Sequence, residues 1–184
     1  MDSEKRDITC SFTGHRPGKL PWGNDENAPE AVRVKEKLRD YIRLLAQQKG
    51  VKRFISGMAP GIDMYAAEAV IELKKELEGI SLECAVPDGD FTGALSPSEK
   101  IRYCRIISGC DSVLFVCDPP CPDSDLIRDR YLADSAKYII AVYSGAEGGT
   151  AYTVNYAKSK GCSMIVIDPV SLKVYASGGR QQNV

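Results

Sequence analysis

The sequence predicts an α/β protein: a single Rossmann-like, doubly wound domain with a mainly parallel sheet and helices on both faces. Short apolar runs alternate with helical patterns along the chain, and this alternation is typical of βαβ units. Right-handed crossovers then place helices on both sides of the sheet. Three glycine-rich junctions follow predicted strands, and open parallel sheets bind ligands beyond the carboxyl ends of their strands. The domain is expected to span residues 1–184, with a core over about 7–168 and a polar tail from about 178.

The first half of the chain contains three apolar runs and two stretches with helical spacing. The helical stretches end at glycines, which favour helix termination. The expected elements, in order, are a strand over 8–12, a helix over 29–48, a strand over 52–55, a helix over 64–77 and a strand over 80–86.

The second half continues the alternation. A helix over 98–108 is expected to direct Ile101, Cys104 and either Ile107 or Ser108 inward. The run over 112–117 is continuously apolar, which is typical of a central parallel strand. The remaining expected elements are a short helix to about 136, a strand over 138–143, a helix to 160 and a strand over 162–168. A strand order of the 3-2-1-4-5 type would bring the three glycine-rich junctions to one crevice.

Charge, apolar content and cysteines argue against several classes of protein. The net charge of −1 offers no global electrostatic argument for nucleic acid. The charged N-terminus resembles no secretory signal, and no apolar run approaches the ~20 residues needed to span a membrane, so a cytoplasmic location is expected. The seven cysteines are expected to be reduced, although Cys117 and Cys121 form a close pair. No metal site is predicted, because His15 is the single histidine and lies far from this pair in sequence.

The first junction, Thr13-Gly14-His15-Arg16-Pro17, leaves the strand over 8–12. Arg16 can bind a phosphate or carboxylate with two parallel hydrogen bonds, and Thr13 can donate a hydroxyl. Gly14 lets the chain turn. His15 is a candidate acid or base, with a packing role as the alternative.

The second junction, over 56–63, and the third, over 145–150, each precede a predicted helix. Unpaired N–H groups and the helix dipole favour anions at such positions. Helix capping is the alternative for Asp63 and Thr150. The residues predicted to bind ligand here are Ser56, Gly57, Met58, Gly61, Asp63, Gly148, Gly149 and Thr150.

Other polar and aromatic residues lie near the same predicted sheet edge. Asp88 and Asp90 follow the strand over 80–86 and could accept ribose hydroxyls, and Arg128 lies in the short helix before the strand over 138–143. Solvated surface roles are the alternatives for all three. The loop aromatics Trp22 and Phe91 could stack on a base, but packing is the first expectation for both.

Four segments together resemble the YpsA-type family of the SLOG superfamily, which also holds the DNA-processing protein DprA and the LOG proteins. The resemblance covers about residues 7–168. The segments that carry it are Ile8 to Pro17, Ser56 to Asp63 with Ala66, Arg128-Asp129 through Asp134, and Gly148 to Thr153 with Ala157.

This resemblance implies a Rossmann-like fold and a pocket for a nucleotide or nucleotide-derived ligand, without a settled activity. LOG enzymes cleave the N-glycosidic bond of cytokinin nucleoside monophosphates. Thr153 occupies the position of the glutamate in their motif, which removes a carboxylate expected to support that reaction. DprA binds single-stranded DNA, but this chain has neither a clearly basic composition nor the winged-helix appendage.

The sequence therefore predicts a protein that binds a small phosphate-bearing ligand, with no certain cofactor and no assigned catalytic residue. LOG-type hydrolysis with Asp63 or Asp88 as the carboxylate is one alternative, and DprA-like DNA binding is another. Membrane partners are not expected, and a homodimer is left open.

Overall fold

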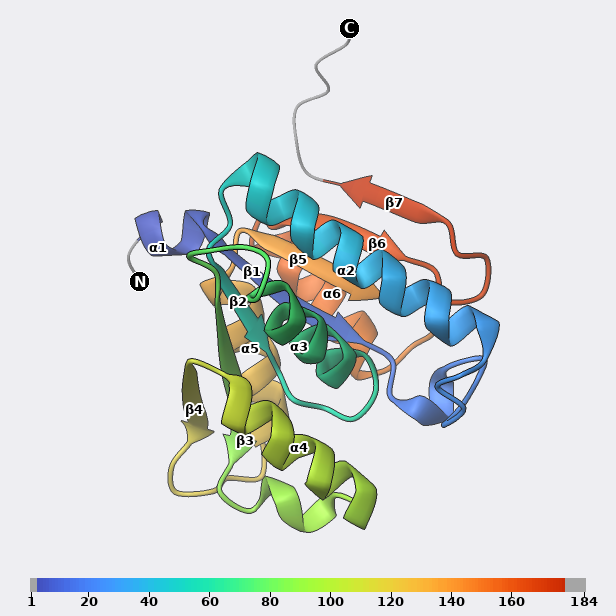
Figure 1. Ribbon diagram of the computed structural model, residues 1–184. Coiled ribbons are helices and arrows are strands. Elements are labelled where there is room, and N and C mark those ends of the chain that lie inside the picture. Colours follow the sequence, from blue (N-terminus) through green and yellow to red (C-terminus); the bar gives the residue numbers. More distant parts are fainter. Residues whose placement is uncertain (1–2, 178–184) are drawn as a thin grey trace, which may run out of the picture.

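The computed structural model describes residues 3–177, so the predicted polar tail from 178 lies outside the described residues. Strands and helices alternate along this part of the chain (Figure 1). The elements are α1 (Ser3–Asp7), β1 (Thr9–Gly14), η1 (Pro17–Lys19), α2 (Pro29–Lys49), β2 (Arg53–Ser56), α3 (Ile62–Leu73), β3 (Ser81–Asp88), η2 (Phe91–Ala94), α4 (Pro97–Gly109), β4 (Ser112–Cys117), α5 (Ser124–Ser135), β5 (Tyr138–Val142), α6 (Gly149–Ser159), β6 (Ser163–Ile167) and β7 (Val174–Ser177).

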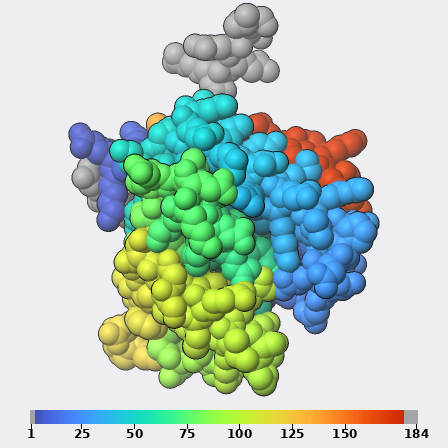
Figure 2. All heavy atoms as spheres, viewed as in Figure 1, coloured from blue at the N-terminus to red at the C-terminus, as the bar shows by residue number. Residues whose placement is uncertain are grey.

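One seven-stranded sheet has the order β4-β3-β2-β1-β5-β6-β7. Six strands are parallel, and only β7 runs antiparallel to its neighbour β6. Helices α2, α3 and α4 lie on one face of the sheet and α5 and α6 on the other (Figure 1). In the space-filling view, α2, α3 and α4 form a continuous layer over their face (Figure 2). The predicted doubly wound α/β fold is confirmed.

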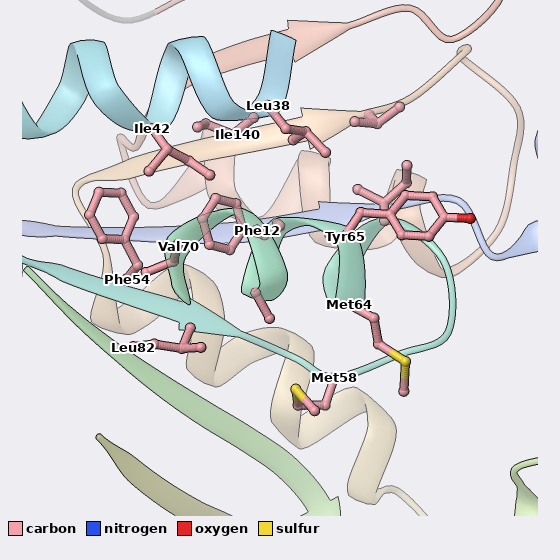
Figure 3. Packing of buried hydrophobic residues seen from close by; sticks show 14 of the residues in the cluster. Phe12, Leu38, Ile42, Phe54, Met58, Met64, Tyr65, Val70, Leu82 and Ile140 are labelled. Atoms are coloured by element: carbon pink, nitrogen blue, oxygen red, sulfur yellow. The ribbon is translucent and has the colours of Figure 1, made fainter. Parts of the chain in front are cut away.

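The main core lies between the sheet and the α2–α4 layer. Helix α2 turns one apolar face inward because its apolar residues recur at helical spacing, and Gly50 caps its C-terminus. Leu38 and Ile42 of this helix pack near Phe12 of β1 and Phe54 of β2, whose rings stack with centroids 6.0 Å apart (Figure 3). Fully burying such side chains stabilises the fold by roughly 1.5–3 kcal/mol each.

The direction of winding reverses between β1 and β5. Strands β2, β3 and β4 extend the sheet on one side of β1, while β5 and β6 extend it on the other. The connections that leave β1 and β5 therefore diverge to opposite faces and open a crevice beyond their carboxyl ends. This topological switch point positions the candidate site.

Strand β4 corrects two sequence-based expectations. It lies at the edge of the sheet, outside β3, rather than centrally, so the order is not of the 3-2-1-4-5 type. Its side chains are half-exposed, with 39% of Val113 and 47% of Phe115 accessible. A continuous apolar run indicates a strand but does not say how many neighbours that strand has. The crevice still forms, because the direction of winding reverses wherever β5 pairs with β1, whatever the position of β4.

Several smaller differences arise from tertiary contacts. Strand β7 was not expected, and α3 ends at Leu73, earlier than predicted. In α4, Ile106 is buried, whereas Ile101 is 74% exposed and Cys104 is also exposed, so the predicted inward direction was wrong for these two residues. Ile107 packs against the core, as expected. Trp22 is buried in the core, which confirms its packing role.

The cysteines divide into two groups. Five are free thiols, as expected: Cys10, Cys84 and Cys162 are buried, Cys110 is half-buried and Cys104 is exposed. Cys117 and Cys121 instead form a disulfide, so the prediction of a reduced thiol was wrong for this pair. The loop between β4 and α5 brings their Cα atoms to 6.1 Å, which is within the range that a disulfide spans.

Candidate functional site

The first turn of α6 is the centre of the candidate site. Its N-cap residue is Gly148, with a φ of 134° that favours glycine, and no side chain caps the helix. Thr150 therefore lies inside the first turn, so a capping role for this residue is wrong. The N–H groups of an uncapped first turn point outward and, with the helix dipole, favour a negatively charged ligand.

The connection after β1 carries two cations, and one of them, Lys19, reaches this helix end. Lys19 of η1 donates from Nζ to the Glu147 carbonyl at 2.7 Å. A Cβ atom at position 148 would lie 2.7 Å from that Nζ, so glycine permits the close approach. Arg16 is 58% exposed, and its guanidinium lies 3.7 Å from the Asp125 carboxylate. An exposed pair at this distance holds Arg16 weakly, which leaves it available to a ligand.

A cavity of about 350 Å³ joins these groups, and we call it the α6 cavity. All three glycine-rich junctions contribute to its wall, together with α5. Its lining residues are Thr13, Gly14, His15, Arg16, Gly18, Lys19, Ala59, Asp63, Asp125, Arg128, Asp129, Gly149, Thr150 and Thr153. Small-molecule sites commonly occupy roughly 300–1,000 Å³.

A buried ion cluster lies against this cavity. The Arg128 guanidinium, 4% exposed, donates from Nε to Asp129 at 2.8 Å, from Nη2 to Asp125 at 3.0 Å and from Nη1 to the Gly57 carbonyl. Burial raises the pKa of Asp63 to about 7, while the nearby Arg128 charge acts in the opposite direction. Arg128 is thus occupied by protein acceptors, and it positions the loop rather than offering a free cation.

The loop over 56–61 makes mostly internal contacts. The Ser56 hydroxyl donates to the Asp63 carbonyl at 2.8 Å and accepts from the Met58 N–H at 3.2 Å. A Cβ atom at Gly57 would lie 2.7 Å from Asp63 Oδ2 and 2.8 Å from Arg128 Cδ. Glycine at this position therefore lets the loop pack against the buried ion cluster.

His15 is buried beside the same cavity. The Ser144 N–H donates to His15 Nε2 at 3.2 Å, so this nitrogen is the acceptor and the neutral ring carries its proton on Nδ1. Burial, aided by the charge of Lys19, lowers the pKa of His15. The ring is therefore neutral near pH 7 and stabilises the loop after β5.

The predicted site residues fall into four groups. Thr13, Gly14, His15, Arg16, Asp63, Arg128, Gly149 and Thr150 line the α6 cavity. Neither this cavity nor the adjacent cavity at the carboxyl end of β3 is lined by Ser56, Gly57, Met58 or Gly148. Gly61 lines a third cavity. Asp88 lines only the neighbouring cavity. Contact of any of them with a ligand stays a prediction.

Sequence reasoning missed Lys19, Asp125 and Asp129, which also line the α6 cavity. Lys19 lies three residues after Arg16 of the first junction, so a search for cations near that junction would have found it. Asp129 follows Arg128 directly and Asp125 precedes it by one helical turn, which is the spacing of helical ion pairs.

Metal-binding clusters and membrane-spanning helices are both absent over residues 3–177. No group of three or more His, Cys, Asp or Glu side chains is placed there to hold a metal ion. Nor is any helix in that range long and apolar enough to cross a membrane.

Fold and site together define a Rossmann-like α/β protein with a cavity at the switch point of its sheet. A protein-family model described as the YspA SLOG family, with the short name YpsA, matches residues 10–171. The chain belongs to this family.

Two curated relatives carry no assigned activity in their names. The uncharacterized SPbeta prophage-derived protein YoqJ of Bacillus subtilis is 30% identical over 142 residues, which cover 71% of this chain and 83% of YoqJ. The UPF0398 protein lwe1908 of Listeria welshimeri is 29% identical over 136 residues, which cover 72% of this chain and 74% of that protein.

Solved structures of DNA processing protein A share the fold. The Helicobacter pylori protein, described for its single-stranded DNA binding mode, matches 91% of this chain and 69% of its own with a TM-score of 0.58 at 17% identity. The Streptococcus pneumoniae protein matches 87% of this chain and 50% of its own with a TM-score of 0.57 at 20% identity. At such identities the likeness shows the fold alone.

Proposed function

We propose that the protein binds a nucleotide or nucleotide-derived phosphate compound, with the phosphate in the α6 cavity. One observation carries this proposal: the uncapped N-terminus of α6, Lys19 and Arg16 meet on a single cavity. Backbone N–H groups and two cations together supply the charge-assisted hydrogen bonds that phosphate oxygens accept.

Arg16→Ala and Lys19→Ala should each weaken binding of a nucleoside monophosphate by roughly 10- to 100-fold, the usual effect of losing a hydrogen bond to a charged group. A thermal-shift screen of nucleotides and sugar phosphates finds the ligand, because saturation at ~100 times Kd stabilises the fold by about 2.7 kcal/mol. Titration calorimetry then measures each variant.

Arg33→Ala and Lys158→Ala are matched controls, since these residues lie on α2 and in the last turn of α6, outside the cavity lining. Both should leave affinity unchanged. A panel without any shift, or a ligand whose affinity survives both cavity substitutions, would rule the proposal out.

A second candidate is hydrolysis of the N-glycosidic bond in such a nucleotide. A specific observation favours it: Asp63 lines the α6 cavity, and its raised pKa of about 7 suits a general acid or base at neutral pH. Free base released from nucleoside monophosphates, lost in Asp63→Asn and kept in Asp88→Asn, would support this activity. Binding without release would leave the protein a binding module.

The predictions of nucleic-acid binding, a homodimer and a cytoplasmic location have less structural support than the phosphate site. Nucleic-acid binding has no support beyond the fold shared with DNA processing protein A, and a gel-shift assay at low salt tests it.

A homodimer also stays a prediction. Strand β4 is the suitable surface for it, because its half-exposed side chains and free edge can pair with a second copy. Light scattering measures the mass of the particle in solution. The cytoplasmic location stays a prediction too.

A further inference from the structure

A second cavity adjoins the α6 cavity at the carboxyl end of β3, and we call it the β3 cavity. It has a volume of about 570 Å³. Arg16, Gly18 and Asp125 line both cavities, so the two are adjacent, with Arg16 at their boundary. The other lining residues of the β3 cavity are Pro17, Asn24, Pro60, Pro87, Asp88, Asp90, Phe91, Ala94, Leu95, Glu99 and Ser124.

The two cavities differ in charge. The α6 cavity combines the uncapped helix N-terminus with as many cations as acidic side chains, namely Arg16, Lys19 and Arg128 against Asp63, Asp125 and Asp129. The β3 cavity is lined by four carboxylates, those of Asp88, Asp90, Glu99 and Asp125, and one cation, Arg16. Like charges repel, so the β3 cavity disfavours a phosphate group. It favours groups that donate hydrogen bonds, such as sugar hydroxyls.

The carboxylates of the β3 cavity are not equally available. Glu99 is held in the capping box of α4 by Ser96, and Asp125 accepts from Arg128. Asp88 Oδ1 accepts the Asp90 N–H at 2.9 Å, which orders the turn after β3. Within residues 3–177, no hydrogen bond or ion pair engages the Asp90 carboxylate, so it is the acceptor most open to a ligand.

Apolar surface completes the β3 cavity. Proline rings from three separate loops, those of Pro17, Pro60 and Pro87, join Leu95 and Phe91 in its wall. Phe91 is held by a tilted contact with Tyr103, with ring centroids 6.0 Å apart. Ligand sites typically combine such apolar walls with a few polar groups that fix orientation, and a flat ring can pack on these surfaces.

From this juxtaposition we infer that the β3 cavity is a second subsite, which takes the uncharged ribose and base of a nucleoside monophosphate whose phosphate lies in the α6 cavity. Asp90 accepts ribose hydroxyls, Phe91 and the prolines contact the ring, and Arg16 lies between the two parts. The inference rests on the proposed function and deepens it, because it assigns the ligand class and its direction in the site.

The test uses the full chain and combines two changes: one removes the Asp90 carboxylate, and the other removes the ribose hydroxyls of the ligand. The probes are inorganic phosphate, the four common nucleoside 5′-monophosphates, and the 2′,3′-dideoxy analogue of the tightest of these. Asp90→Ala should weaken the ribonucleotide about tenfold, as expected for a lost hydrogen bond to a charged acceptor. It should leave the dideoxy analogue and inorganic phosphate within about twofold, since neither offers the hydroxyls. Asp40→Ala, on the exposed side of α2, is the matched control and should change nothing.

The outcomes separate the two proposals. If phosphate binds and Lys19→Ala weakens it, but Asp90→Ala affects ribo- and dideoxynucleotides equally, the second subsite is wrong and the proposed function stands. The second subsite is also wrong if the nucleotides bind no tighter than phosphate alone. If no probe binds, the proposed function fails and the second subsite fails with it.

Discussion

Replacing Arg128 by methionine should lower the free energy of unfolding by about 3–5 kcal/mol, the usual cost of removing one partner from a buried ion pair. The guanidinium is shared by Asp129, Asp125 and the Gly57 carbonyl, and its charge also opposes the raised pKa of Asp63. Methionine fills much of the vacated volume, so the loss reflects uncompensated polar groups more than a cavity. Urea denaturation measures the difference.

Arg130→Met is the matched control for this substitution. Arg130 lies in the same helix but is exposed, and it makes one hydrogen bond, from Nε to the Tyr152 hydroxyl at 2.8 Å. An exposed change of this kind usually costs within about 0.5 kcal/mol. Similar losses in the two variants would contradict the role assigned to Arg128. Arg128→Lys should fall between wild type and Arg128→Met, because lysine keeps the charge but cannot reach three acceptors in one plane.

The second large effect concerns pH. Burial raises the pKa of Asp63 from 3.8 to about 7 in the folded state, against the opposing charge of Arg128. Between these two values the folded protein holds a proton that the unfolded chain has released. The contribution of Asp63 to stability is therefore fully present below about pH 4 and is lost as pH rises through the folded pKa. A shift of this size corresponds to on the order of 4 kcal/mol.

The contribution of Asp63 is isolated by comparison with Asp63→Asn, which cannot titrate. The stability of the variant relative to wild type should increase steadily from pH 4 to pH 7 and level off above that, because over this range only wild type has an Asp63 carboxylate whose ionisation stabilises the unfolded chain. Chemical denaturation at each pH gives both free energies of unfolding. A difference that stays constant over this range would show that Asp63 is ionised in the folded protein throughout.

Most of the fold was predictable because its signals are local. The spacing of apolar residues in α2 and the apolar strands around it reflect burial that each segment requires for itself. The neighbours of a strand are not a local property. The run over 112–117 has the composition of a central strand yet lies at the edge, and β7 pairs with β6 only because the chain turns back after residue 167.

The candidate site shows the same division. The residues that line the α6 cavity near Arg16, Asp63 and Thr150 come from junctions that the sequence singled out. The sequence did not show that the predicted site residues would be divided between two cavities of different charge. Asp88 and Asp90 were expected at the same sheet edge as acceptors of ribose hydroxyls, and the structure places them in the adjoining acidic cavity, outside the lining of the α6 cavity.

By itself the sequence determined the fold class, the approximate positions of most elements and the junctions at which a ligand would bind, because hydrophobic periodicity and glycine placement act over a few residues. Only the tertiary structure decided the strand order, the burial that raises the pKa of Asp63, and the meeting of Lys19 with the N-terminus of α6. Each of these depends on which segments, distant along the chain, the packed sheet brings together, and burial and charge act through such neighbours.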